Sequence, residues 1–97
     1  MERQSPRSVG EVLREVLQQN NLQQIIDETR AKNLWREVVG AEIAHECKTP
    51  YVANGVMTVG IPNAALRHEM SMNRSLLRET INSIIGKNTI KEIRFTS

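Results

Sequence analysis

His45, Glu46 and Cys47 stand in a row and form the cluster that most resembles a reactive or metal-binding site. Cys47 is the single cysteine, and His68 is the second of two histidines. Zinc sites need three or four ligands, and the chain has no CxxC or HExxH motif to complete a set. A cysteine nucleophile would need a base, an orienting group and an oxyanion hole, which no pattern indicates. We therefore expect no enzyme activity, no catalytic residue, no metal, no cofactor and no small-molecule substrate.

Trp35 is the single tryptophan and lies in an apolar stripe with Leu34, Val38 and Val39, directly before Gly40. A lone aromatic in an aliphatic core provides much of the buried area. An exposed tryptophan would instead offer a stacking platform for a nucleic-acid base. We favour the first interpretation, in which Trp35, Val38 and Val39 belong to the structural core and Gly40 allows the chain to break.

Basic residues in the second half of the chain form a candidate nucleic-acid-binding surface. Two predicted helices and the segment after them carry six such residues: Arg67, Arg74, Arg78, Lys87, Lys91 and Arg94. Arg74 and Arg78 are four residues apart and share a helix face. In a compact fold the six residues could converge into one basic stripe. The alternative is a scattered, solvated surface that acids such as Glu69 and Glu79 offset.

The composition is that of a single globular domain of 97 residues, with 39% hydrophobic and 25% charged residues. The formal net charge is only +2, although the pI is about 9.0. Such a weak basic bias permits a local nucleic-acid-binding patch without requiring one. A single cysteine fits a reducing compartment, and the start "MERQSPRSVGE" shows no apolar leader. We expect a cytoplasmic protein that does not associate with membranes.

The first 40 residues predict two helical segments after a flexible N-terminal arm over residues 1–7. Ser8 and Glu11 form a capping box, and apolar residues then recur at helical spacing as far as the Asn20-Asn21 pair; these residues are Val9, Val12, Leu13, Val16 and Leu17. The second helix has a broad apolar stripe that includes Ile25 and Ile26. A phase shift in this stripe predicts a bend or break near Ala31. Asp27 and Glu28 on this helix are interpreted as solvated.

From Lys48 the pattern changes to that of a sheet. Asn54-Gly55 between two β-rich runs predicts a hairpin, with Met57, Val59 and Ile61 on one face of its second strand. Two helices follow, over residues 63–70 and from about 74 to 85, and Ile90–Thr96 predicts a last strand. Three strands and several helices predict an α+β fold, with helices on one face of a three-stranded sheet.

These segments together resemble the DciA-like family. The resemblance rests on "LWREVVG" from Leu34, "NGVMTVGIPNAALRHEM" from Asn54, "LLRETIN" from Leu76 and "IKEIRF" from Ile90. It implies one domain over residues 8–97 with a K-homology-like β-β-α-α-β part. It also implies a non-catalytic accessory of bacterial DNA replication, whose partners are the replicative DNA helicase and single-stranded or forked DNA.

Two features depart from the patterns that this resemblance implies. Met70–Asn73 takes the place of the GxxG loop with which K-homology domains grip nucleic acid. The chain also stops after its last strand, at Ser97, without the basic tail of many family members. Two alternatives therefore stay open. One is a protein adaptor that docks through a surface around Met70 and Met72, and the other is an RNA-binding module.

Overall fold

The computed structural model describes residues 8–12, 14 and 22–97. The predicted capping box at Ser8 is confirmed in part, because the Ser8 hydroxyl accepts a hydrogen bond from the Glu11 amide at 3.1 Å. Residues 9–12 and 14 are helical. The predicted arm over residues 1–7, the apolar positions Leu13, Val16 and Leu17, and the helix end at Asn20-Asn21 lie outside the described residues.

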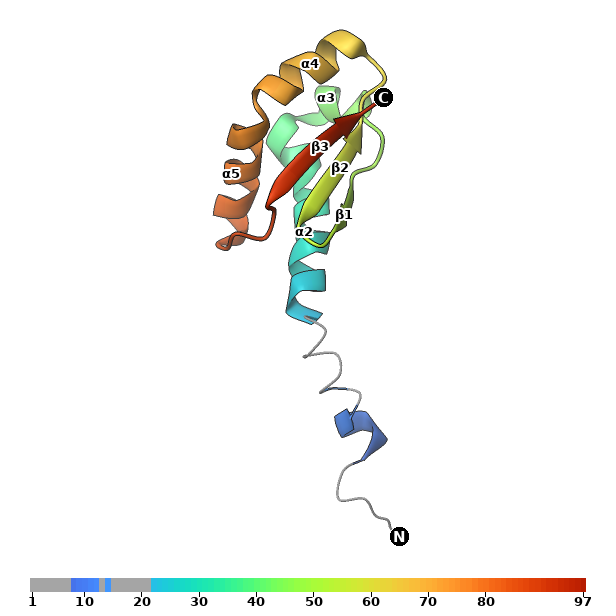
Figure 1. Ribbon diagram of the computed structural model, residues 1–97, viewed down its shortest axis with the longest axis vertical. Coiled ribbons are helices and arrows are strands. Elements are labelled where there is room, and N and C mark those ends of the chain that lie inside the picture. The colour runs from blue at the N-terminus through green and yellow to red at the C-terminus, as the bar shows by residue number, and fades with distance from the viewer. Residues whose placement is uncertain (1–7, 13, 15–21) are drawn as a thin grey trace.

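The rest of the chain forms an α+β domain, as the sequence predicts (Figure 1). A long helix and a short one precede a hairpin, two further helices and a last strand. The bounds are α2 Leu22–Val39, α3 Ala41–His45, β1 Tyr51–Ala53, β2 Val56–Gly60, α4 Ala64–Met72, α5 Arg74–Ile85 and β3 Glu92–Thr96. The order from β1 onward is the β-β-α-α-β arrangement that the family resemblance implies.

The three strands form one mixed sheet in the order β1-β2-β3. The β1–β2 hairpin is antiparallel and turns at Asn54 and Gly55, whose φ angles of 53° and 81° are both positive, as a type I′ turn requires. Helices α4 and α5 connect β2 to β3, which pairs parallel to β2 with Met57 opposite Ile93. The crossover therefore places α4 and α5 next to the edge strand β3.

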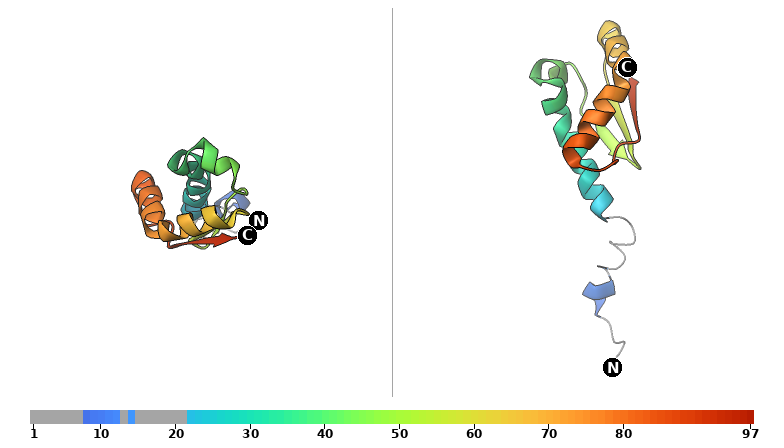
Figure 2. Two further views of the ribbon diagram at one scale, coloured as in Figure 1. Left: turned by 90° about the horizontal axis from the view of Figure 1, so that it is seen from above. Right: turned by 90° about the vertical axis from the view of Figure 1, so that its left-hand side faces the viewer.

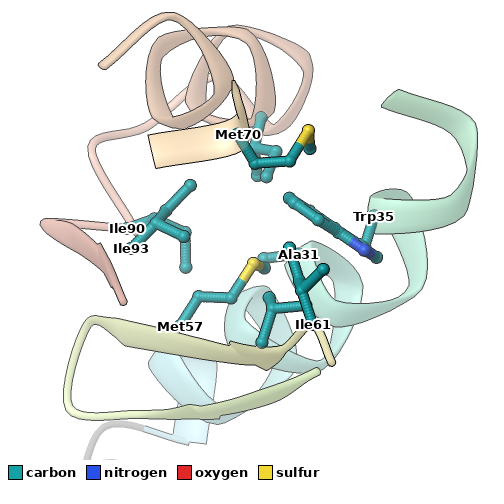
Figure 3. Close-up of a cluster of buried hydrophobic side chains, with 9 residues drawn as sticks. Ala31, Trp35, Met57, Ile61, Met70, Ile90 and Ile93 are labelled. Carbon is teal, nitrogen blue, oxygen red and sulfur yellow. The ribbon is translucent and has the colours of Figure 1, made fainter. Parts of the chain in front are cut away.

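The helices cover one face of the sheet (Figure 2). Met57, Val59 and Ile61 are fully buried on that face, as their alternation predicts. Trp35 is 2% exposed and its ring packs against Phe95, with the ring centroids 6.1 Å apart. The core cluster around Trp35 contains residues from the helices and from the sheet (Figure 3). These residues are Ala31, Trp35, Met57, Val59, Ile61, Met70, Ile81, Ile90 and Ile93. Val38 and Val39 pack against its edge.

Helix α2 corrects two predictions. It runs unbroken through Ala31, which is fully buried in the core. The buried stripe begins with Asp27 and Glu28 and continues at regular helical spacing, whereas Ile25 and Ile26 are about half exposed. The helix ends at Val39, and Gly40, whose φ is 92°, is the N-cap of α3.

Glu28 is buried because it accepts a hydrogen bond from the hairpin turn. Its Oε2 atom lies 2.7 Å from the Gly55 amide nitrogen and 3.1 Å from the amide nitrogen of the Gln24 side chain. The Gly55 carbonyl in turn accepts hydrogen bonds from the Lys91 and Glu92 amides. One residue of the turn thus connects α2 to the start of β3.

We expect Glu28→Ala to lower the free energy of unfolding by about 1–3 kcal/mol, because the buried Gly55 N–H would lose its acceptor. Urea denaturation followed by circular dichroism would measure the change. Glu37→Ala, at an exposed position on the same helix, is the matched control and should change stability by less than about 0.5 kcal/mol. Equal stability of the two variants would contradict the role assigned to Glu28.

Candidate nucleic-acid interface

The junction between α4 and α5 contains a single residue, Asn73. Its amide donates to the Met70 carbonyl at 3.1 Å, and its side-chain nitrogen donates to the Glu69 carbonyl at 3.0 Å. The Asn73 carbonyl accepts from the Leu77 amide at the start of α5. The two helices thus meet without an open loop, so a phosphate could be held here only by side chains.

Arg67, on α4, stands apart from the other five predicted basic residues. Its guanidinium is half-buried and donates to the Ile61 carbonyl at 2.7 Å, with a longer contact to Pro62. These contacts connect α4 to the segment that leaves β2. Arg67 therefore supports the fold through these contacts. It lies beside the end of β2, whereas Lys87 and Lys91 lie in the loop before β3, at the opposite end of the sheet.

Arg74 lies at the first turn of α5, and Arg94 lies on the edge strand β3. Arg94 is exposed and binds the Glu92 carboxylate at 2.9 Å. The pKa of Glu92 is held below its usual range mainly by this hydrogen bond, and the nearby positive charges of Arg94 and Arg74 lower it further. Arg74, at the first turn of α5, therefore lies within electrostatic reach of the Glu92–Arg94 pair.

The remaining three residues surround the loop between α5 and β3. Lys87 forms an ion pair of 2.8 Å with Asp27 on α2. Arg78 and Lys87 line one shallow cavity, and Lys87 and Lys91 line the next. The Lys91 stem lies against Gly55, where an added Cβ would meet its Cγ at 3.2 Å. These neighbours connect Arg78, Lys87 and Lys91 into one surface at this end of the domain.

Acidic partners reduce the charge of this surface. Arg78 contacts Glu79 at 3.6 Å, and Lys87 and Arg94 have the partners described above. Arg74 and Lys91 make no ion pair with any described residue. Five of the six predicted residues thus lie on α5, β3 and the loop between them, and the shared cavities join Arg78, Lys87 and Lys91. Arg74 and Lys91 are the two of these five without an ion pair among the described residues.

The chain matches the family model described as "Dna[CI] antecedent, DciA" over residues 8–95. The protein belongs to the DciA family. Membership agrees with the resemblance in the sequence and links the protein to DNA replication and helicase loading. No curated protein matches the chain.

The sequence-based interpretation missed Asp27 and Glu28 in this DciA-family domain. Both were interpreted as solvated acids, but they are 7% and 8% exposed. Their partners, Lys87 and the Gly55 amide, lie far away in the sequence. The spacing of the residues could have indicated their burial. Residues 27, 28, 31, 34 and 35 lie on one face of the helix, so the two acids occupy the same face as the apolar residues that follow them.

The cluster at His45 and Cys47 does not assemble a metal site in the DciA-family domain. Among residues 8–12, 14 and 22–97, no three His, Cys, Asp or Glu side chains gather closely enough to hold a metal ion. The Cys47 thiol donates to the Ile43 carbonyl at 3.2 Å. Burial raises the pKa of this thiol, and the indole N–H of Trp35 opposes part of the shift. A thiol of raised pKa is a poor nucleophile.

Two apolar side chains are exposed at the α4–α5 junction. Met72 is 73% exposed and Leu76 is 62% exposed, four residues apart across Asn73. Met70, which the sequence grouped with Met72, is instead a core residue at 6% exposure, because it faces the sheet.

No helix among the described residues has the length and apolar character needed to cross a membrane.

The pKa of Asp27 is lowered, chiefly by its hydrogen bond from Lys87 and then by that from Gln23. A carboxyl group with a lowered pKa in the folded state contributes stability above its unfolded pKa of about 3.9. That contribution is lost as the pH falls through the folded-state value. We therefore expect Asp27→Asn to lower stability at pH 7 and to flatten the loss of stability below about pH 5.

Urea unfolding between pH 7 and pH 2.5 would measure this pH dependence. Glu79→Gln is the matched control, because the Glu79 carboxylate is 65% exposed in its contact with Arg78. A profile of Asp27→Asn parallel to that of the unmodified protein would show that the ion pair with Lys87 does not contribute.

Proposed function

We propose that this DciA-family protein is a non-catalytic accessory that binds single-stranded or forked DNA and helps to load or operate the replicative helicase in the bacterial cytoplasm. Family membership supports the link to replication and helicase loading. The observation that supports DNA binding is the grouping of Arg78, Lys87 and Lys91 around the loop between α5 and β3, with Arg74 on α5 and Arg94 on β3 as further exposed cations.

Arg74 and Lys91 are assigned the direct phosphate contacts. Both are exposed and have no acidic partner among the described residues. Arg78, Lys87 and Arg94 contribute to the field of the surface, but each would have to exchange its carboxylate for a phosphate. The α4–α5 junction has no glycine loop that would let the backbone approach a phosphate. The phosphate contacts must therefore come from charged side chains, and the affinity for DNA should fall as the salt concentration rises.

We expect the double variant Arg74→Glu, Lys91→Glu to lower affinity for labelled single-stranded or forked DNA by at least about tenfold at low salt. The slope of log affinity against log salt should become shallower by roughly 0.7 for each lost phosphate contact to a single strand. Fluorescence anisotropy at several salt concentrations would measure both quantities, with duplex DNA and RNA of the same sequence as comparisons.

Arg30→Glu, Lys32→Glu is the charge-matched control for this experiment, since both positions are exposed on α2. The control should keep at least half of the affinity. Absence of DNA binding even at low salt would contradict the proposal, and tighter binding of RNA than of DNA would favour the RNA-binding alternative.

The second candidate function is a protein adaptor, and the exposed Met72 and Leu76 favour it. Neighbouring exposed apolar side chains are typical of protein-binding surfaces. If α4 and α5 contact the helicase, Met72→Asp, Leu76→Asp should reduce helicase capture in a pull-down by at least tenfold. Ile25→Asp, about half exposed on α2, is the control and should bind normally. Equal capture of all three proteins would exclude this surface.

A further inference from the structure

The face of the sheet opposite the helices, here called the outer face, is not covered by any described helix (Figure 2). Met57 and Val59 are fully buried on the helix side, so Thr58 between them projects from the outer face. Strand pairing places Tyr51 of β1 on one side of Thr58 and Arg94 of β3 on the other. These three residues therefore form one row across the outer face.

Tyr51 gives the outer face an exposed aromatic ring, because this residue is 68% exposed. The other two aromatic residues of the chain, Trp35 and Phe95, pack against each other in the core. Proteins that bind single strands stack bases on aromatic side chains, and in one RNA-binding fold these side chains project from a sheet. The ring of Tyr51 is placed for the same kind of contact.

Lys48 supplies positive charge beside this row. Its stem lies against Gly60, where an added Cβ would meet the Lys48 Cδ at 2.7 Å. A Cβ at position 60 would project from the same face as Thr58, two residues earlier in β2. The ammonium group donates one hydrogen bond to the Ser97 carbonyl at 3.1 Å. Lys48 is therefore held against the outer face, where its charge can attract a phosphate.

Arg94 supplies positive charge at the other end of the row. It is exposed, and its guanidinium binds the Glu92 carboxylate, which offsets part of the charge. Two strand spacings, about 10 Å, separate its position from that of Tyr51. Arg74 on α5 lies within electrostatic reach of Glu92. The outer face thus adjoins the surface that carries the proposed phosphate contacts.

We propose that the outer face holds a single DNA strand by stacking one of its bases on Tyr51. Lys48 and Arg94 would attract the phosphates that flank this base, and Arg94 would exchange the Glu92 carboxylate for a phosphate. Bases of a duplex are paired and stacked on one another, so the contact selects single-stranded DNA. This inference rests on the proposed function, because it specifies how the single strand is recognised.

We expect Tyr51→Ala to lower the affinity for a labelled single strand by at least about fivefold. Tyr51→Phe keeps the ring and should bind normally. Loss of stacking releases no counterions, so the slope of log affinity against log salt should not change in Tyr51→Ala. Fluorescence anisotropy at several salt concentrations measures both quantities. His68→Ala, which removes an exposed ring from α4, is the control and should bind normally.

An abasic strand of the same length, which keeps the phosphates but has no bases, provides a second measurement. The unmodified protein should bind it at least about fivefold more weakly than the strand with bases, whereas Tyr51→Ala should bind both strands equally.

Three results would each overturn the inference and leave DNA binding through Arg74 and Lys91 intact. These are unchanged affinity in Tyr51→Ala, the same loss in Tyr51→Phe as in Tyr51→Ala, and equal binding of the two strands by the unmodified protein. Absence of binding to every strand at low salt would overturn the proposed function and this inference with it.

Discussion

The hydrogen bond between the Glu28 carboxylate and the Gly55 amide is the constraint on which the arrangement of this domain depends. It joins a helix that precedes the sheet to the turn of the hairpin, at 2.7 Å and out of contact with solvent. The Gly55 carbonyl then receives the amides of Lys91 and Glu92, where β3 begins. A buried carboxylate without such a donor would be costly, so the helix, turn and last strand stabilise one another.

Asp27, next to Glu28, extends this constraint to the basic surface. Its ion pair with Lys87 attaches the loop after α5 to α2. The Asn82 side chain holds the same loop from the other side, through hydrogen bonds with the backbone of Ile90. Contacts to α2 and α5 therefore determine the positions of Lys87 and Lys91. Lys87 itself makes one of these contacts, through its ion pair with Asp27. Acidic residues thus help to decide which cations remain available to DNA.

The DciA-family domain presents positive charge in two distinct settings. Around α5 and β3 the cations lie on an open surface, where contacts to a nucleic-acid backbone would be individually weak and dependent on salt. Beside Trp35 the exposed Lys32 and Arg36 line a small depression, and the indole N–H of Trp35 is directed at the Cys47 thiol. The first setting suits a long polyanion.

The sequence determined the features that depend on local patterns. Asn54-Gly55 fixed the hairpin, the alternation of Met57, Val59 and Ile61 fixed its buried face, and Gly40 fixed the end of α2. Only the tertiary structure decided that Asp27 and Glu28 are buried, that Met70 and Met72 separate, and which cations have acidic partners. Those outcomes depend on partners such as Lys87 and Gly55, which lie far along the chain and meet α2 only when the sheet forms. Hydrophobic periodicity reports which face of an element is apolar, but it does not report a buried acid whose donor comes from another element.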